Sequence, residues 1–187
     1  MLKLTNICHS YDGRSVLENV NLTVLPGQRV ALMGPSGVGK TTLLRIAMGT
    51  LKPISGTVEN TFSKTAVLFQ EPRLLPWRTA AENVNLVLGD SHATLETARA
   101  HLEQLGLGDA ADKYPEELSG GMQQRTALAR ALAYGGDLLI LDEPFKALDE
   151  ALRLQVMAKV AAADAAILLV THEESEAAAL GCEILRI

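Results

Sequence analysis

The octapeptide GPSGVGKT, residues 34–41, places glycines, a lysine and a hydroxyl residue at the spacing G-x-x-x-x-G-K-[ST]. It follows residues 28–33, which we predict to form a short strand, and it opens a predicted helix from about Gly39 to Met48. Glycines let main-chain N–H groups approach a polyphosphate closely, and the start of a helix favours an anion. We therefore expect Lys40 to reach the β- and γ-phosphates of a nucleotide and the Thr41 hydroxyl to bind Mg²⁺.

A pair of carboxylates follows the apolar run LLIL at residues 138–141. Such a run is typical of a parallel strand buried on both faces, and open α/β sheets bind ligands at the carboxyl ends of these strands. We predict that Asp142 holds Mg²⁺ through water and that Glu143 polarises the attacking water as a general base. A surface charge is the alternative role for Glu143. The nucleotide-binding positions predicted beside them are Gly34, Pro35, Ser36, Gly37, Val38, Gly39, Lys40, Thr41 and Thr42.

The stretch LSGGMQQR, residues 118–125, begins a predicted helix that runs from Ser119 to about Ala133. It places two glycines in the first turn, each of which costs roughly 1 kcal/mol relative to alanine. A serine N-cap with a flexible turn is one physical explanation. The other is a second phosphate contact, because glycine permits close approach and a helix start favours negative charge.

Together, GPSGVGKT, LLILDEP and LSGGMQQR resemble the motifs of the ATP-binding cassette (ABC) ATPases, and the resemblance covers nearly the whole chain. It implies ATP and Mg²⁺ as cofactors. It also implies a head-to-tail dimer with a second copy of the chain or another cassette, in which each LSGG signature closes over the ATP held by the other subunit. The signature positions Ser119, Gly120, Gly121 and Gln123 would then contact the partner's nucleotide.

Four further positions match the motifs of the family. Tyr11, in HSYDG, resembles the aromatic residue that stacks on adenine, with packing as the alternative role. His172, in LLVTHEE, resembles the switch histidine that contacts the γ-phosphate, with a structural role as the alternative. Gln70, in VLFQEP, resembles the Q-loop glutamine that binds Mg²⁺ and faces the membrane partner, and both Gln70 and His172 join the predicted catalytic residues. Asp149 resembles the D-loop aspartate of the dimer interface, and Lys146 replaces the small residue often found in that segment.

Length and composition restrict the class of protein. The chain has 187 residues and a net charge of −5, and it lacks an apolar run near the roughly 20 residues that cross a bilayer. We predict one domain without a secretory signal, and the acidic balance argues against nucleic acid as a partner. Because 48% of the residues are hydrophobic but only 4% are aromatic, the core must consist mainly of Ala, Leu, Val and Ile. Cys8 and Cys182 fit no metal spacing, so we expect reduced thiols.

The order of the predicted elements favours an α/β fold, and the resemblance specifies a P-loop NTPase core of the ABC-cassette type with an N-terminal antiparallel β subdomain and a helical signature subdomain. Residues 79–106 have a helical pattern, with Leu95, Ala98, Leu102 and Leu105 on one face. We expect a single ABC ATPase domain, 1–187, in which 1–74 and 131–187 form the catalytic core and about 75–130 form the helical subdomain. Predicted strands also cover residues 2–8, 15–25, 56–60, 64–70, 165–171 and 182–187, and a further helix covers 150–163.

The segment FQEPRLLPWRTAAENV, residues 69–84, resembles that of the nitrate/sulfonate/taurine-type import ATPases. Five of its residues give a stiff apolar surface on which a permease helix could dock: Pro72, Leu74, Leu75, Pro76 and Trp77. A loop packed on its own helical subdomain is the alternative. The resemblance implies an ATP-hydrolysing subunit that powers transport of a small solute, in the direction of import. Its partners would be integral-membrane permease subunits, at the cytoplasmic face of the cell membrane.

Two other functions stay open at this point. A non-transport ABC ATPase acting in repair or translation would resemble either two tandem cassettes or a cassette split by a long coiled coil, and this chain has neither feature. A nucleotide-binding module without turnover is the third possibility, against which Glu143 and His172 argue. The chain ends at Ile187, soon after His172, whereas many importer ATPases continue, so we expect either a minimal cassette or an absent tail. Because such an ATPase does not touch the cargo, no residue identifies the transported molecule.

Overall fold

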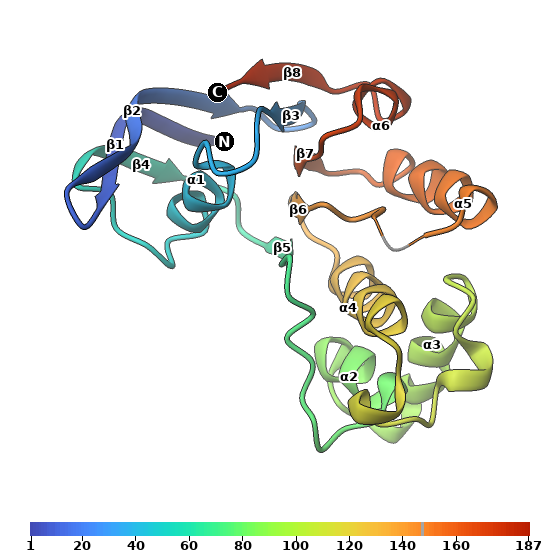
Figure 1. The fold of residues 1–187 in the computed structure, drawn as a ribbon. Coiled ribbons are helices and arrows are strands. Elements are labelled where there is room, and N and C mark those ends of the chain that lie inside the picture. The colour runs from blue at the N-terminus through green and yellow to red at the C-terminus, as the bar shows by residue number, and fades with distance from the viewer. Residues whose placement is uncertain (147) are drawn as a thin grey trace.

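Two sheets form the framework of the computed structural model, which describes residues 1–146 and 148–187 (Figure 1). The first sheet is antiparallel, with the order β2-β1-β4, and contains β1 (Leu2–Tyr11), β2 (Arg14–Val24) and β4 (Ser55–Asn60). The second sheet is parallel, with the order β5-β6-β7-β3-β8. Its strands are β3 (Arg29–Met33), β5 (Thr65–Leu68), β6 (Leu138–Asp142), β7 (Ala166–Val170) and β8 (Glu183–Arg186). The predicted α/β architecture with an N-terminal antiparallel sheet is therefore confirmed.

Six α-helices complete the described part of the chain: α1 (Lys40–Ala47), α2 (Ala80–Asn85), α3 (His92–Glu103), α4 (Gly120–Tyr134), α5 (Glu150–Ala161) and α6 (Glu174–Ala179). Short 3₁₀ turns lie at Leu86–Leu88, Gly108–Ala110 and Pro115–Glu117. Helices α2, α3 and α4 pack on one another at one end of the molecule, and α5 and α6 lie beside the parallel sheet (Figure 1). We call α2, α3, α4 and their connections the helical region.

The stretch predicted to be helical, residues 79–106, forms two helices rather than one. Thr79 and Glu82 form a capping box that starts α2, and the chain turns at Gly89 and Asp90, both with positive φ, before α3 begins. The predicted apolar stripe lies on α3 and just beyond it, and its members pack in the core: Leu95, Ala98, Leu102 and Leu105. Helix α6 was not predicted, because its sequence ESEAAA has no apolar spacing that distinguishes a helix from a loop.

Strands β6 and β7 are buried along their whole length, as expected for central strands of a parallel sheet. Alternate residues of β6 enter two different cores. Leu138 and Ile140 pack against α1 and the antiparallel sheet, while Leu139 and Leu141 pack against helices of the helical region and α5. The residue that follows β6 is thus fixed by packing on both faces of the sheet.

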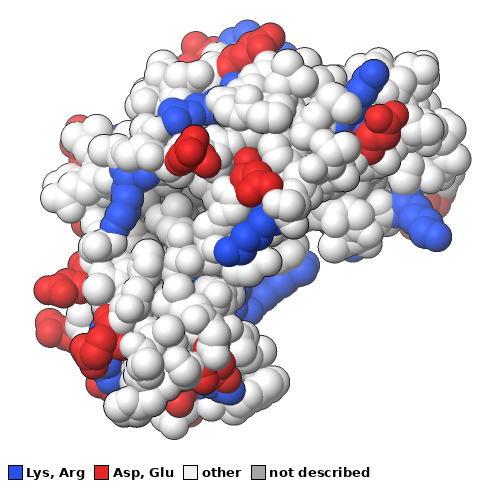
Figure 2. All heavy atoms as spheres, turned by 180° about the vertical axis from the view of Figure 1, so that it is seen from behind, with Lys and Arg blue, Asp and Glu red and all other residues white. Residues whose placement is uncertain are grey.

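The surface carries charges of both signs close to one another. Figure 2 shows basic and acidic side chains interspersed on the face opposite to the view of Figure 1. Among the residues that the structure describes, no helix is long and apolar enough to cross a membrane.

Replacement of Leu102 by alanine should lower the free energy of unfolding by about 2–5 kcal/mol, because the side chain is fully buried between α3 and the rest of the helical region. Leu154→Ala is the matched control, since Leu154 lies on α5 with 59% of its surface exposed. The control should change the free energy by about 0.5 kcal/mol or less. Urea denaturation followed by circular dichroism measures both values. Equal effects of the two substitutions would contradict this description of the core.

Candidate functional site

The loop between β3 and α1 depends on glycine at two positions. Gly39 has φ +110°, and a Cβ there would lie 2.7 Å from Leu17 Cδ2 and 2.9 Å from the Val16 carbonyl oxygen. A Cβ on Gly34 would collide with the main-chain carbonyl of Ile187. Since neither position has room for a side chain, the two glycines fix how closely the loop packs against β2 and the end of β8.

Lys40 is buried, with 7% of its surface exposed, and its ammonium group points back into the loop that precedes it. Its Nζ donates hydrogen bonds of 2.8 Å to the carbonyl oxygens of Gly34 and Pro35. An ammonium group has three donors, so these two bonds leave one direction for a further acceptor. The charge therefore lies inside the curve of the loop, at the start of α1.

Asp142 ends β6 and is also buried, with 5% of its surface exposed. Burial first, and then the charge of Glu143, raise the pKa of its carboxyl to about 6, although a hydrogen bond with Thr41 and the charges of Lys40 and His172 act in the opposite direction. A carboxylate held in this way gains from a nearby cation. The site thus favours a positive ion close to Asp142.

Glu143 follows Asp142 with φ +49°, in the left-handed region that non-glycine residues rarely adopt. Its N–H donates to the Val170 carbonyl of β7 at 3.0 Å, which holds this backbone conformation. One carboxylate oxygen lies 3.1 Å from His172 Nε2, and the other accepts a 2.8 Å hydrogen bond from Lys146 Nζ. The hydrogen bond from Lys146 is the largest cause of a lowered pKa of Glu143, so the carboxylate form is favoured.

The segment that carries His172 is fixed by a buried pair. The Thr171 hydroxyl donates a hydrogen bond to the Glu176 carboxylate at the start of α6, and it accepts the N–H of Glu173 at 3.0 Å. Sequence reasoning missed the roles of Lys146, Thr171 and Glu176. The only available signal was the separation of three residues between Glu143 and Lys146, which can bring two side chains together in a helical turn.

Most of the predicted site residues line one cavity of about 360 Å³. It collects residues from the ends of β1, β6 and β7, from the first part of β2, from the phosphate loop with the start of α1, and from the loop after β5. The lining residues are Tyr11, Val16, Ser36, Gly37, Gly39, Lys40, Thr41, Thr42, Gln70, Asp142, Glu143, Val170 and His172. Gly34, Pro35 and Val38 belong to the same loop, although they are not part of this lining.

The predicted signature and D-loop residues lie elsewhere in the single chain. The Ser119 hydroxyl caps α4 by accepting the Met122 N–H at 3.3 Å, as in the structural alternative for this motif. The Gln123 amide donates to the carbonyls of Pro115 and Leu118. Asp149 caps α5 by accepting the N–H of Leu152, and Gly120 and Gly121 begin α4. No Cβ contact restricts Gly120, so packing within the chain does not require a glycine there.

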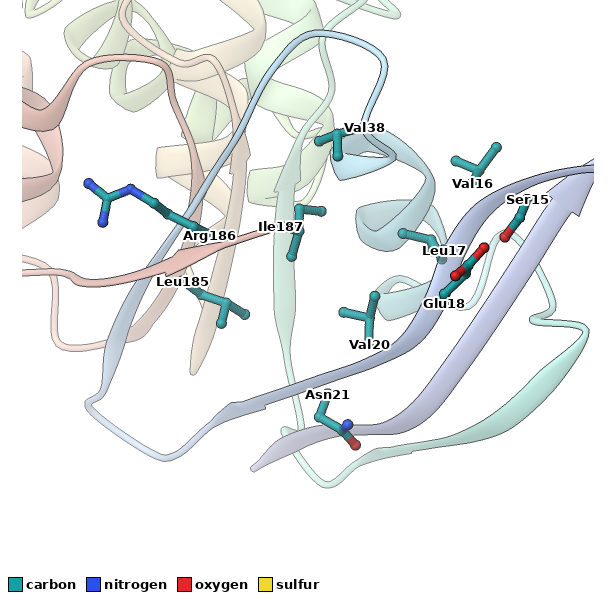
Figure 3. Close-up of a pocket in the computed structure, with 10 residues that line it drawn as sticks. All are labelled: Ser15, Val16, Leu17, Glu18, Val20, Asn21, Val38, Leu185, Arg186 and Ile187. Atoms are coloured by element: carbon teal, nitrogen blue, oxygen red, sulfur yellow. The ribbon is translucent and has the colours of Figure 1, made fainter.

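A larger hollow of about 430 Å³ lies between β2 and β8 (Figure 3). Val20, Leu185 and Ile187 face one another across it, and the Arg186 side chain extends away, where it pairs with Glu174 at 2.6 Å. The lining is largely aliphatic and offers no cluster of phosphate-binding groups. The smaller cavity beside Lys40 offers such groups, and the predicted nucleotide site there stays a prediction.

A model of the ABC transporter family matches residues 17–146. Aliphatic sulfonates import ATP-binding protein SsuB 1 of Rhodococcus jostii is 45% identical over 193 residues, which covers 98% of this chain and 78% of that protein. SsuB 3 of Nocardia farcinica is 49% identical, with 90% and 69% covered. SsuB 1 of Burkholderia lata is 42% identical over 98% of this chain but only 60% of its own length.

Solved structures with the same fold cover the whole chain. A dimeric post-hydrolysis state of the ATP-binding cassette MJ0796, bound to ADP and Pi, has a TM-score of 0.87 and 30% identity, and 94% of that chain is covered. The ATP-binding subunit of an ABC transporter has a TM-score of 0.88 and 26% identity, with 85% of that chain covered. These likenesses confirm the predicted P-loop fold of the ABC-cassette type.

Lys146→Met should raise the pKa of Glu143, because the substitution removes the hydrogen-bonded cation that lowers it. Protonation of Glu143 would then begin at a higher pH as the solution is acidified. Carbon-13 NMR titration of glutamate-labelled, nucleotide-free chain measures this shift, with the Glu143 signal assigned by its absence in Glu143→Gln. Lys146→Arg keeps the charge and is the control. An unchanged titration in Lys146→Met would contradict the ion pair.

Proposed function

The chain belongs to the ABC transporter family and is an ATP-binding cassette that hydrolyses ATP, and we propose that it powers the import of a small solute through head-to-tail dimerisation with a second cassette. One observation carries the proposal: the cavity that joins the phosphate loop, Asp142 and Glu143 at the edge of the parallel sheet. The names of the relatives, all import ATP-binding proteins, support the direction of transport and give no support to the alternative in repair or translation.

We assign the triphosphate to the loop of residues 34–42 and adenine to the ring of Tyr11. The side chain of Tyr11 is 42% exposed, and its ring lies edge-on to that of His9, with 4.8 Å between the ring centres. The oxygen atoms of Thr41, Gln70 and Asp142 line the same cavity and suit Mg²⁺, which prefers oxygen ligands and usually shares them with substrate phosphates. Within residues 1–146 and 148–187 no group of three or more His, Cys, Asp or Glu could hold a metal ion. Mg²⁺ bound in the cavity would neutralise charge on the phosphates.

Glu143 is assigned the role of general base. Its carboxylate lies at the cavity in the ionised form, which can accept a proton from an attacking water. His172, 3.1 Å from that carboxylate, would orient it and donate a hydrogen bond toward the γ-phosphate. The left-handed backbone of Glu143 sets the direction in which its side chain leaves the main chain. The carboxylate is therefore already positioned at the cavity before substrate binds.

The dimer is the part of the proposal that explains the signature residues. None of the signature residues lines the cavity of its own chain: they lie at the start of α4 and are Ser119, Gly120, Gly121 and Gln123. Asp149, at the start of α5, also lies outside that cavity. A second cassette in the opposite orientation would bring them over the nucleotide and complete two equivalent sites. The location of the signature residues away from their own cavity supports the division of the chain into two parts. These are a catalytic core, 1–74 and 131–187, and a helical subdomain, about 75–130, and this division stays a prediction.

The transported solute and the membrane partner are proposed from the relatives. Those proteins are named for aliphatic sulfonates, so we propose a small sulfonate as the cargo and separate permease subunits as partners at the cytoplasmic face of the membrane. The docking surface is narrower than the sequence suggests. Leu74 packs against the core and Leu75 is half-buried, whereas Pro76 and Trp77 are exposed, with Trp77 at 70%.

Glu143→Gln should lower the rate of ATP hydrolysis by about 10²–10⁴-fold, because the amide cannot act as a general base. The variant should still bind ATP and accumulate as an ATP-bound dimer. Light scattering coupled to gel filtration at saturating MgATP measures its mass. Adding Ser119→Arg to the same variant is expected to restore the monomer, since a long cation would occupy the start of α4. A dimer that persists in this double variant would sink the head-to-tail arrangement.

Trp77→Asp should abolish binding to the permease without affecting ATP hydrolysis by the isolated chain, because Trp77 is exposed and outside the nucleotide cavity. Tagged chain is recovered from detergent-solubilised membranes of its source cell, and co-purified proteins are identified by mass spectrometry. Leu154→Asp alters a similarly exposed apolar residue on α5 and serves as the control. We expect a polytopic membrane protein with the unmodified chain and the control only. Recovery of soluble proteins alone would count against transport.

A further inference from the structure

The loop of residues 69–79, between β5 and α2, joins two places that the proposed function uses. Gln70 lies near its beginning and lines the nucleotide cavity, while Trp77 lies near its end and is 70% exposed. Within this loop the described main-chain bonding is sparse, with one bond from the Arg78 N–H to the Leu75 carbonyl at 3.2 Å. Its shape must therefore come from side chains of other elements.

Those side chains belong to the helical region. On α4, Arg130 donates from both guanidinium ends, at 2.9 Å to the Pro72 carbonyl and at 3.0 Å to the Arg73 carbonyl. Also on α4, the Gln124 amide donates to the Phe69 carbonyl at 3.3 Å. Three main-chain carbonyls in the first half of the loop, those of Phe69, Pro72 and Arg73, are thus bound to one helix.

The second half of the loop is held by a fully buried amide on α2. Asn83 accepts the Leu75 N–H at 2.8 Å and donates to the carbonyls of Leu75, Arg78 and Thr79. The loop therefore has anchors on α4 and α2, and Trp77 lies between the bonds made by Asn83.

The contact made by Arg130 is the strongest of these by chemistry. A charged, forked donor that binds two carbonyls is stronger and more directional than a neutral amide bond. Burial lowers the pKa of Arg130, which shows that the group is partly removed from water, where loss of a hydrogen bond is costly. The Arg73 guanidinium lies 3.9 Å from the centre of the Phe69 ring. This contact brings the two residues of the loop together.

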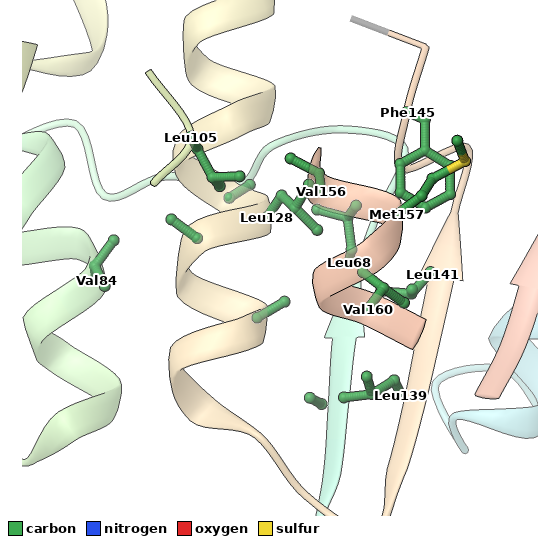
Figure 4. Close-up of a cluster of buried hydrophobic side chains, with 14 of the residues drawn as sticks. Leu68, Val84, Leu105, Leu128, Leu139, Leu141, Phe145, Val156, Met157 and Val160 are labelled. Carbon is green, nitrogen blue, oxygen red and sulfur yellow. The ribbon is translucent and has the colours of Figure 1, made fainter. Parts of the chain in front are cut away.

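Helix α4 lies between β5 of the parallel sheet and the other two helices of the helical region. In Figure 4 it runs between Val84 of α2 on one side and Leu68 of β5 on the other, and Leu128 faces Val156 of α5. The same helix begins with the LSGG motif at its other end. Whatever moves the start of α4 consequently moves the groups fastened along it.

We propose that Arg130 is a positioning residue that fastens the loop of residues 69–79 to α4, so that Gln70 and Trp77 move together with the LSGG end of that helix. The functional consequence of this movement rests on the proposed function, in which the LSGG motif contacts ATP and Trp77 contacts the permease. The attachment itself is a property of the single chain.

Hydrogen–deuterium exchange of the full chain without nucleotide tests the attachment. In Arg130→Met, exchange of the Leu75 and Arg78 N–H groups should rise about tenfold or more, because the loop loses its charged anchor and the hydrogen bonds of these two groups open more often. Arg130→Lys keeps the positive charge but cannot bind two carbonyls at once, so exchange in the loop should rise by less than in Arg130→Met. This variant also tests the proposal if Arg130→Met does not fold. Unchanged protection of β6 shows an intact core.

Arg125→Met is the matched control. Arg125 lies on the same helix and also binds main-chain carbonyls, those of Leu105 and Gly106, but these are in the connection after α3. The control should leave exchange of the same two N–H groups unchanged. The proposal is overturned if neither Arg130 variant affects the loop, or if Arg125→Met loosens it equally.

Trp77 supplies a second readout, because the chain contains one tryptophan. We expect MgATP to change its fluorescence in the unmodified chain, and we expect at least half of this change to be lost in Arg130→Lys at equal occupancy by ATP. A full response in both Arg130 variants, or no response in the unmodified chain with ATP bound, overturns the proposal. Equilibrium dialysis measures the bound ATP in the same samples, and absence of binding would contradict the proposed function instead.

Discussion

The parallel pairing of β3, β6 and β7 is the constraint on which the rest of the structure depends. Strands that run in the same direction end at the same edge, so the segments that leave them are brought together regardless of their distance in sequence. Asp142 ends β6, Lys40 and His172 lie beyond the ends of β3 and β7, and the three residues share one cavity for this reason. Since the strands are buried on both faces, their positions are set by packing, and the polar groups at their ends have little freedom to separate.

Much of this arrangement could be predicted because its signals are local. The phosphate loop has a fixed spacing between a strand and a helix, and LLIL before Asp142 indicates a doubly buried strand. The stripe from Leu95 to Leu105 indicates a helix in the same way. Helix α6 and the break at Gly89 could not be predicted, because short helices carry no periodic pattern and a single glycine is compatible with several conformations. The exposed apolar surface at residues 72–77 is smaller than the sequence suggests for a related reason: Leu74 and Trp77 are both apolar, and only the fold decides that Leu74 packs against the core. Docking of a permease there stays a prediction.

The environment of Glu143 shows what spacing alone omits. The motif supplies a carboxylate, but the role of general base that we propose for it would depend on the left-handed backbone, the bond to Val170 and the two donors around its oxygens. Lys146 is one of those donors, at a position where the motif carries no lysine. A cation there favours the ionised form of Glu143 but also makes that form a weaker base. The chain therefore combines a reliably charged carboxylate with reduced basicity, in contrast to Asp142, whose pKa burial raises to about 6.

The two glycines that begin α4 support the dimer that we propose. Each weakens the helix by roughly 1 kcal/mol relative to alanine, and the chain itself offers no compensation at Gly120, where a Cβ would meet nothing within 4 Å. Ser119 satisfies a main-chain donor of the first turn, yet a cap alone does not need glycine after it. Close approach by a group of the proposed second cassette would give a reason for glycine at this position. Because Arg130 and Gln124 fasten the loop of Gln70 and Trp77 to this same helix, contact at its start would be felt both at the nucleotide cavity and at the exposed tryptophan.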